Sequence, residues 1–306
     1  MWNEDDFLQR KVAATPSELK VIRLNVYEDT VRSVLSGGYM TKEKGYLSFD
    51  FSNCKSILYD EHLIPFKARY NKHTQIEVVQ NDCLRESLRF KELGLNPILL
   101  NMANRKIPGF GLIQGGTQED TLFRRTSLFL SLYQFYKDYH KDCLPFLEKG
   151  LCDIKQQQAQ YPLSEDLGAI YSSGVYVFRD DENSGYRYLK DPMQISILST
   201  AGIYRPKLTE TNRLNANDEL RLSEKIRTIF RIALLHNHDS MVLGALGCGA
   251  FANPPEHVAE IFHKVLDEDE FKNQFDKIVF AIVDDKNAYR EHNPHGNFLP
   301  FVKEFS

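Results

Sequence analysis

The chain has 306 residues, of which 42% are hydrophobic and 26% are charged. These are ordinary globular values, so the chain is long enough to bury a large core in one domain or two. A formal net charge of −4 and an isoelectric point near 6.2 argue against a dedicated nucleic-acid binder, which needs a strongly basic face.

Cysteine and histidine usage predicts no metal site. The five cysteines are scattered without a Cys-x-x-Cys pair, and the nine histidines show no spacing typical of metal ligands. An odd, scattered set of cysteines indicates a reducing compartment. We therefore expect no metal and no cofactor.

No segment is typical of a membrane protein or of a Sec substrate. No apolar run approaches the roughly 20 residues that a transmembrane helix needs. The first residues, MWNEDDFLQRK, are acidic and lack the apolar core of a Sec signal peptide. We therefore expect no membrane span and a cytoplasmic location, or delivery into a host cell by a more specialised secretion route.

The N-terminal part of the chain predicts a helical extension over residues 1–70. Ser17–Ser36 has the apolar spacing of a helix, which Thr15-Pro16 starts and Gly37-Gly38 ends. Tyr46–Phe51 alternates apolar and polar residues and predicts a strand.

Residues 71–306 predict one α/β domain that begins with a β-α-β unit. Gln75–Gln80 is rich in β-branched residues and predicts a strand, and Asp82 follows at the start of a helix. Gly94 ends that helix, and the apolar run Ile98–Met102 predicts a buried strand. Ligands of open α/β sheets bind at the C-terminal ends of such strands.

The stretch after this strand carries most of the candidate chemistry. A glycine-rich loop leads to the polar triplet Gln118-Glu119-Asp120, where a helix predicted over Gln118–Asp138 begins. A strand, a glycine loop and a helix start direct backbone N–H groups and the helix dipole toward an anion, usually a phosphate. Two carboxylates at the same place suggest chemistry beside that phosphate. The other polar and glycine positions of this stretch are Asn101, Asn104, Gly109, Gly111, Gly115 and Gly116.

The second half of the chain predicts further elements around another glycine loop. Gly247–Phe251 lies between a predicted strand, Met241–Leu246, and a predicted helix, Glu256–Leu266. Lys277–Val283 predicts a last central strand, which Asp284-Asp285 follows. The remaining predicted elements are the strands Ile170–Ser172, Val175–Phe178 and Met193–Leu198 and the helices Glu219–His236 and Asn297–Ser306.

The two glycine loops together predict a clasp for a diphosphate. Neither has the pattern of a P-loop, and neither has the complete dinucleotide-binding fingerprint. Turn chemistry also explains each loop alone, and the preference of acidic residues for a first helical turn also explains Glu119 and Asp120. Likewise, Asp82 is explained as an N-cap, Cys248 as a packed core residue and Phe251 as a core plug instead of a stacking surface.

The runs LNMAN…PGFG…GGTQEDTLFRRTSL and GALGCGAFANPPEHVA resemble the signature and the second phosphate loop of the bacterial-type poly(ADP-ribose) glycohydrolases, a branch of the macrodomain fold. VVQNDCL, YSSGVYVFRDD and KIVFAIVDD are similar to other segments of that family. The resemblance implies a macrodomain-like three-layer α/β/α fold with a mixed central sheet and an N-terminal helical extension.

The resemblance also assigns roles to single residues. It implies that Asp82 and Cys83 bind the adenine and that Asn101 and Asn104 address the distal ribose. Phe251 would pack beside the ribose and the adenine. Glu119 and Asp120, next to the substrate-binding Gln118, would flank the scissile glycosidic bond as the catalytic pair. The diphosphate would be held by Gly109, Phe110, Gly111, Gly247, Cys248, Gly249 and Ala250.

Two positions differ from the family pattern. Phe110 interrupts the three glycines of the first loop, and Asp120 replaces the second glutamate, which sets its carboxylate back by roughly an ångström. Asp180, Asp181 and Asp284 are further candidates for the catalytic set.

We expect an ADP-ribosyl hydrolase that binds ADP-ribose and acts on mono-ADP-ribosylated protein, with arginine as the linked residue. A guanidinium leaving group is already cationic and depends less on an acid than a sugar does. The alternatives are a reader that binds ADP-ribose without cleaving it, a poly(ADP-ribose) glycohydrolase, and an enzyme acting on a related small nucleotide.

Overall fold

The computed structural model describes residues 2–67, 73–109, 115–148 and 150–306. The chain forms two compact units, each built from separate stretches of the sequence. Unit 1 comprises residues 1–57, 103–162 and 172–196, and unit 2 comprises residues 58–102, 163–171 and 197–306. The division into an extension, residues 1–70, and a catalytic domain, residues 71–306, stays a prediction.

A seven-stranded mixed sheet, with helices around it, confirms the predicted α/β fold class. Its strand order is β3-β6-β7-β5-β8-β9-β4, and β1 and β2 form a separate antiparallel pair. The strands are β1 (Gly38–Thr41), β2 (Gly45–Ser48), β3 (Lys55–Tyr59), β4 (Gln75–Val79), β5 (Pro97–Met102), β6 (Ala169–Arg179), β7 (Tyr188–Thr200), β8 (Ser240–Leu243) and β9 (Lys277–Ala281).

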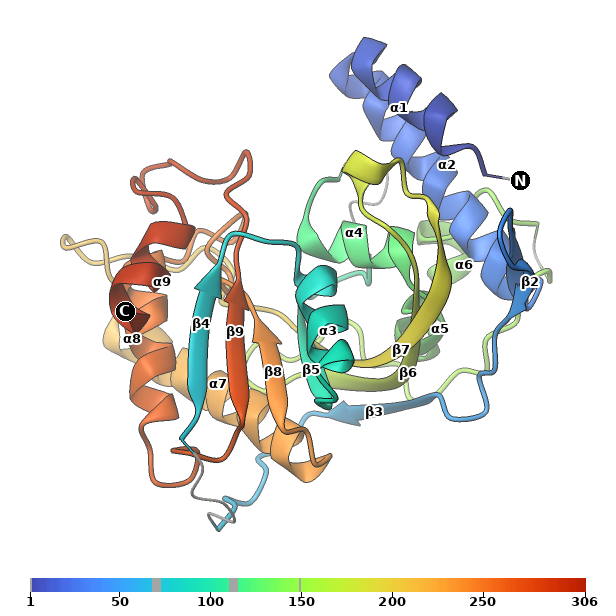
Figure 1. The fold of residues 1–306 in the computed structure, drawn as a ribbon. Helices are drawn as coiled ribbons and strands as arrows, with labels where there is room; N and C mark the ends of the chain where they lie inside the picture. The colour runs from blue at the N-terminus through green and yellow to red at the C-terminus, as the bar shows by residue number, and fades with distance from the viewer. Residues whose placement is uncertain (1, 68–72, 110–114, 149) are drawn as a thin grey trace. The chain divides into compact units, whose positions relative to one another are not determined.

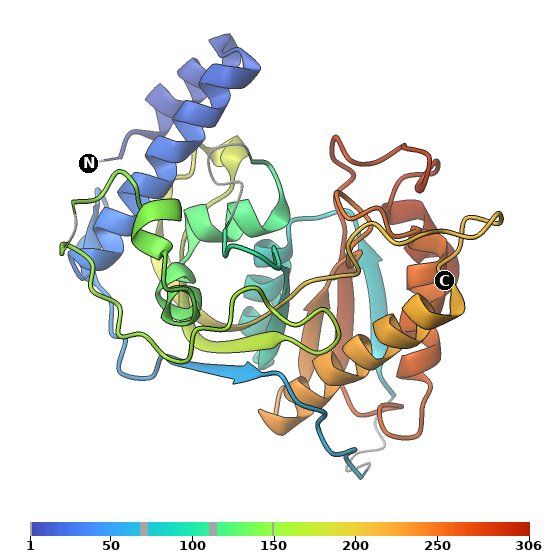
Figure 2. The ribbon, with the colours of Figure 1, turned by 180° about the vertical axis from the view of Figure 1, so that it is seen from behind.

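Unit 2 has the predicted three layers. Its strands β5, β8, β9 and β4 pair in parallel. As in any β-strand, alternate side chains point to opposite faces of the sheet. Helix α3 covers one face (Figure 1), and α7 crosses the other (Figure 2). The helices of this unit are α3 (Cys83–Glu92), α7 (Ala216–Leu235), α8 (Pro255–Leu266) and α9 (Phe298–Phe305).

Aromatic side chains fill the face of the unit 2 sheet that α7, α8 and α9 cover. The ring of Phe262 on α8 packs edge-on against Phe280 of β9, with centroids 5.3 Å apart. Phe301 of α9 packs against the same Phe280 ring at 5.1 Å. All three side chains are fully buried, and burial of a large apolar side chain stabilises a fold by roughly 1.5–3 kcal/mol. This cluster anchors the strands whose ends carry the candidate binding segments.

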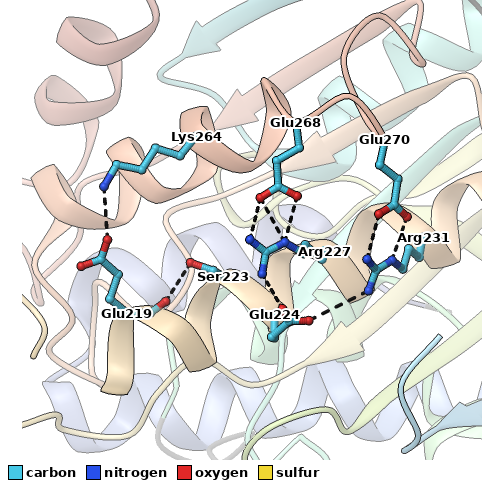
Figure 3. Close-up of polar contacts among 8 residues, drawn as sticks. All are labelled: Glu219, Ser223, Glu224, Arg227, Arg231, Lys264, Glu268 and Glu270. Carbon is cyan, nitrogen blue, oxygen red and sulfur yellow. Dashed lines mark hydrogen bonds and ion pairs between the residues drawn. The ribbon is translucent and has the colours of Figure 1, made fainter. Parts of the chain in front are cut away.

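A row of ion pairs joins α7 to α8 and to the turn after α8 (Figure 3). Arg227 makes a forked contact with Glu268 at 2.6–3.0 Å, and Arg231 makes one with Glu270 at 2.8 Å. Glu224 lies between the two arginines and pairs with Arg227. Forked arginine–carboxylate contacts fix orientation as well as distance, so these two contacts fix α7 against the turn that follows α8.

Unit 1 begins with two helices that run alongside each other, α1 (Glu4–Ala13) and α2 (Pro16–Leu35) (Figures 1 and 2). Thr15 and Glu18 form a capping box at the start of α2, which confirms the predicted helix start. The Thr30 hydroxyl of α2 donates to the Arg124 carbonyl of α4 (Gln118–Arg125) at 2.6 Å. The shorter helices of the unit are α5 (Phe129–Leu132), η1 (Tyr133–Phe135), α6 (Tyr139–Asp142) and η2 (Glu182–Ser184).

Several predicted elements are wrong in extent. The helix predicted over Gln118–Asp138 ends at Arg125, because Thr126 turns extended and bridges Val177 of β6. The N–H of Ser127 then donates to the Tyr176 carbonyl at 3.0 Å instead of continuing the helix. The strands predicted over Ile170–Ser172 and Val175–Phe178 are one strand, β6. No helix among the described residues is long and apolar enough to cross a membrane.

Candidate active site

The start of α4 carries the predicted catalytic pair into the interior of unit 1. The hydroxyl of Thr117, the N-cap, accepts the N–H of Asp120 at 3.3 Å, and the Asp120 carboxylate accepts the N–H of Thr117 at 3.1 Å. Gln118 is half-buried at the first helical position, and Glu119 and Asp120 are buried. Two adjacent buried carboxylates are more than a first-turn charge preference requires, because that preference is satisfied at the surface.

Glu119 reaches back to the chain that follows β5. Its carboxylate accepts the N–H of Asn104 at 2.9 Å. The Asn104 side-chain oxygen in turn accepts the N–H groups of Lys106 and Ile107 at 2.8 and 3.3 Å, which closes a tight polar turn. Glu119 is therefore fixed between the helix start and the turn after the strand. The expected contact of Asn104 with a ribose stays a prediction.

Asp120 occupies an environment that disfavours its charge. Burial raises its pKa, and the nearby Arg124, the hydrogen bonds from Thr117 and the charge of Arg23 offset burial only in part. Its second oxygen, Oδ1, is buried and has no hydrogen-bond partner among the described residues. A buried oxygen without a partner costs about 1–3 kcal/mol, and such groups gather at functional sites.

The first glycine loop is shaped by the helix that follows it. Gly109 has a φ of +66°, and a Cβ at this position would lie 2.8 Å from the Phe123 ring of α4. Only glycine fits both the backbone conformation and this close approach. Phe110 and Gly111, two of the predicted diphosphate contacts, lie outside the described residues.

Three predicted binding segments of unit 2 lie at the C-terminal ends of its strands. The four strands are parallel and in register, since Ser240 of β8 is aligned with Pro97 of β5 and with Lys277 of β9. Their C-terminal ends therefore lie on the same side. Asp82 follows β4, Asn101 is the second-to-last residue of β5, and the second glycine loop follows β8.

The two polar residues at this edge have structural partners. Asp82 caps α3 by accepting the N–H of Arg85 at 3.0 Å, and the buried Cys83 is the first residue of that helix. Asn101 is fully buried, and its amide donates to the Ser199 hydroxyl at 3.0 Å. The N-cap interpretation of Asp82 is correct, and its contact with adenine stays a prediction.

The second loop is a tight backbone turn held from behind. The Cys248 carbonyl accepts the ring N–H of His292 at 2.8 Å and the amide of Asn293 at 3.4 Å. Because a trans peptide points its N–H opposite to its carbonyl, the Gly249 N–H is directed away from His292. Gly247 has a φ of +77°, and a Cβ on Gly202 would lie 2.9 Å from its Cα. The loop thus presents backbone N–H groups in the manner of an anion site.

Phe251 lies half-buried beside this loop and does not act as a core plug. Its ring meets the exposed Tyr204 ring edge-on, with centroids 5.2 Å apart and planes at 87°. Its carbonyl accepts the N–H of Arg205 at 2.8 Å. An aromatic ring fixed in this way at the rim of a phosphate-type loop is suited to stacking on a ligand.

A family model described as the microbial-type PARG catalytic domain, where PARG is poly(ADP-ribose) glycohydrolase, matches residues 28–180, half of the chain. The chain belongs to this family. The PARG of Thermomonospora curvata is 27% identical over 92% of this chain and 99% of its own, with a TM-score of 0.72. The PARG of Deinococcus radiodurans, solved with ADP-ribose, is 25% identical over 78% of this chain and 86% of its own, with a TM-score of 0.59. A search of curated proteins finds no match.

The chain is therefore a PARG-type glycohydrolase, and the resemblance seen in the sequence is confirmed. The matched residues contain the candidate groups from Asp82 to Asp120, whereas Gly247–Phe251 lies beyond them. A second PARG structure of Thermomonospora curvata contains the inhibitor ADP-HPD, and it is 26% identical to this chain over 92% of it, with a TM-score of 0.69.

The additional aspartates considered for the catalytic set have other partners. Asp181 caps η2 through the N–H groups of Asn183 and Ser184, and Asp180 pairs with Arg187 at 3.1 Å. Asp284 accepts the N–H of Asn297 at 2.7 Å, at the start of α9. Within the described ranges, no three His, Cys, Asp or Glu side chains form a possible metal site.

Sequence reasoning missed two residues near Glu119 and Asp120. The Tyr161 hydroxyl is buried without a partner among the described residues. Burial, then the charges of Glu119 and Cys143, raise the pKa of Tyr161 well above its usual value. Arg23 of α2 donates to the Gly115 carbonyl at 2.6 Å. Neither residue lies in a recognisable motif, so only the fold brings them to the site.

Proposed function

We propose that this chain cleaves the glycosidic bond that joins ADP-ribose to a modified protein, and that mono-ADP-ribosyl arginine is its substrate. The oxygen of water would bond to the anomeric carbon of the ribose while the bond from that carbon to the guanidinium nitrogen breaks. The proton lost by the water would pass to the departing arginine, so the products are ADP-ribose and the unmodified side chain.

The observation that carries this proposal is the position of Asp120. Where the family signature has a second glutamate, this chain has a shorter side chain whose carboxylate is bound back to the Thr117 N–H of its own helix cap. A sugar leaving group needs an acid that extends to its oxygen, whereas a guanidinium leaves without one. A short, retracted carboxylate therefore suits the cationic leaving group better.

In this mechanism Glu119 has the central role. The N–H of Asn104 fixes its carboxylate at 2.9 Å. A carboxylate fixed in this way would hold the attacking water, accept its proton and stabilise the positive charge that develops on the ribose. Asp120 would complete the negative environment that the guanidinium needs.

Each glycine loop is a candidate phosphate-binding segment of its own unit. The N–H of Gly109 in unit 1, and those of Gly247, Gly249 and Ala250 in unit 2, would donate to phosphate oxygens, with Phe251 against the ribose and adenine. Asp82, Cys83, Asn101 and Asn104 would fix the adenine and the distal ribose.

One observation favours poly(ADP-ribose) as a second candidate substrate. Burial raises the pKa of Asp120, and a raised pKa favours the protonated carboxyl, which is the form that can donate a proton to a sugar leaving group. The solved relatives are named as poly(ADP-ribose) glycohydrolases.

The deciding experiment offers arginine-ADP-ribosylated protein and poly(ADP-ribose) side by side and measures the release of ADP-ribose. We expect release from the arginine substrate and loss of release in Glu119→Gln. Release from the polymer alone would replace our proposal with the second candidate. Binding of ADP-ribose without release from either substrate would instead make the chain a reader.

A further inference from the structure

Arg23 of α2 contacts both the glycine loop and η2. Its Nε and Nη2 donate to the two carboxylate oxygens of Glu182 at 2.7 and 2.8 Å. Its remaining nitrogen, Nη1, donates to the Gly115 carbonyl at 2.6 Å. We call these three groups the Arg23 clamp. All of them belong to unit 1, and the side chains of Arg23 and Glu182 are 18% and 20% exposed.

The clamp holds the C-terminal end of the first glycine loop, at Gly115 and Gly116. Gly115 lies two residues before Thr117, the N-cap of α4, and a Cβ on Gly116 would be only 3.4 Å from Arg23 Nη1. A fork-shaped contact leaves the guanidinium little freedom, so the Gly115 carbonyl is fixed relative to η2. The position of the α4 start, with Glu119 and Asp120, follows from this constraint.

A second branch of the same network connects Glu182 to α4 through Tyr186. The Tyr186 hydroxyl donates to Glu182 at 3.0 Å and accepts from Arg124 of α4 at 2.9 Å. Tyr186 and Arg124 are both buried. Glu182 thus connects to the loop through Arg23 and to the helix through Tyr186 and Arg124. One carboxylate sets both ends of the segment that carries the catalytic pair.

We infer that Arg23 is a positioning residue for the catalytic pair, acting through the Gly115 carbonyl and anchored by Glu182. This inference rests on the proposed function of Glu119 and Asp120. The family model spans residues 28–180, which include Gly115, whereas Arg23 and Glu182, the two side chains of the clamp, lie just outside its two ends.

The charged neighbours of Asp120 allow positioning to be separated from electrostatics. Arg124 on α4 and Arg23 on α2 lower its pKa against burial, and Thr117 donates to it. Removal of the Arg23 charge therefore raises the pKa of Asp120, whereas removal of the Glu182 charge does not. A pure charge effect predicts opposite outcomes for Arg23→Gln and Glu182→Gln, but a positioning effect predicts the same loss for both.

The test measures kcat, KM and their pH dependence for Arg23→Gln, Glu182→Gln and the control Lys11→Gln. Lys11 also pairs with Glu182, at 3.2 Å, but is not part of the clamp. We expect both clamp variants to lose kcat by about 10- to 100-fold with a smaller change in KM, because small displacements of catalytic groups cost that much. The acid limb of the profile of kcat against pH should shift to higher pH only in Arg23→Gln. Lys11→Gln should behave as the unmodified chain.

Hydrogen exchange separates failure of this inference from failure of the proposed function. We expect faster exchange of the amides of residues 115–121 in Arg23→Gln and Glu182→Gln, but not in Lys11→Gln. If the unmodified chain turns over no substrate and exchange still increases, the clamp stands and the proposed function fails. If kcat and exchange in both clamp variants match those of Lys11→Gln, the inference is overturned.

Discussion

Asp120 and Thr117 hold each other at the start of α4, each through the backbone N–H of the other. The same carboxylate is therefore a helix cap and a candidate catalytic group. A cap contributes roughly 0.5–2 kcal/mol to stability, whereas the burial of Asp120 opposes its ionisation. At neutral pH the cap stabilises the fold and the burial of the charge destabilises it. A substitution at Asp120 can therefore change activity without lowering stability.

Asp120→Asn should lower activity without lowering stability. The raised pKa means that the folded chain binds more protons than the unfolded chain just above pH 4, so stability falls as pH rises through the folded pKa of Asp120. A neutral asparagine removes this fall. We expect a melting temperature at pH 7 equal to or above that of the unmodified chain, with at least a roughly 100-fold loss of kcat. Full activity in this variant would remove Asp120 from the mechanism.

Asp120→Glu restores the side chain of the family signature and tests the leaving-group argument. The added methylene extends the carboxylate by roughly an ångström toward the substrate. We expect the ratio of kcat/KM for poly(ADP-ribose) to that for ADP-ribosyl arginine to increase at least several-fold. An unchanged ratio would show that the length of this side chain does not select the substrate.

The second glycine loop should respond to ADP-ribose. Saturation with ADP-ribose should slow hydrogen exchange at residues 247–252 of unit 2. The amides in the middle of α7 serve as an internal reference. Unchanged exchange at residues 247–252 would contradict the proposal that this loop binds the diphosphate.

Phe251→Ala should weaken ADP-ribose binding by about 10-fold, since loss of an aromatic stacking contact costs roughly 0.5–1.5 kcal/mol beyond the buried area. Isothermal titration calorimetry measures this directly. Leu220→Ala, at an exposed position on α7, is the matched control and should bind as the unmodified chain does. Equal affinity of all three proteins would place the ring outside the ligand site.

His238 should make unit 2 less stable in acid. Burial, assisted by the charges of His236 and Lys91, outweighs the backbone contact with Asn96 and lowers the pKa of His238 from 6.5 to about 4. Its stabilising contribution is therefore complete above pH 6.5 and is lost as pH falls toward 4, by about 3 kcal/mol at most. Urea unfolding from pH 7 to 4.5 should show a steeper decline for the unmodified chain than for His238→Gln.

The ion pairs in the row of Figure 3 should differ in strength. The side chains of Arg231 and Glu270 are only 9% and 12% exposed, whereas those of Lys264 and Glu219 are 61% and 35% exposed. Double-mutant cycles should give a coupling of about 1–2 kcal/mol for the first pair and below about 1 kcal/mol for the second. Equal couplings would show that burial does not set the strength of these pairs.

The sequence alone determined the local features of this protein. Thr15-Pro16 predicted the start of α2, and the apolar runs before Asp82 and around Asn101 predicted the strands β4 and β5. The motif around Gln118-Glu119-Asp120 was also sufficient to place the chain in its family, because short-range spacing encodes it directly.

Only the tertiary structure decided which distant residues support this motif. The spacing of apolar residues after Arg125 is helical, yet the chain leaves the helix because Thr126 pairs with Val177, a partner that no local pattern announces. Likewise, Arg23 and Glu182 are ordinary charged residues in the sequence, and they become a clamp because the fold of unit 1 places both beside Gly115. Contacts between residues far apart in the chain depend on packing, and packing is a property of the folded chain as a whole.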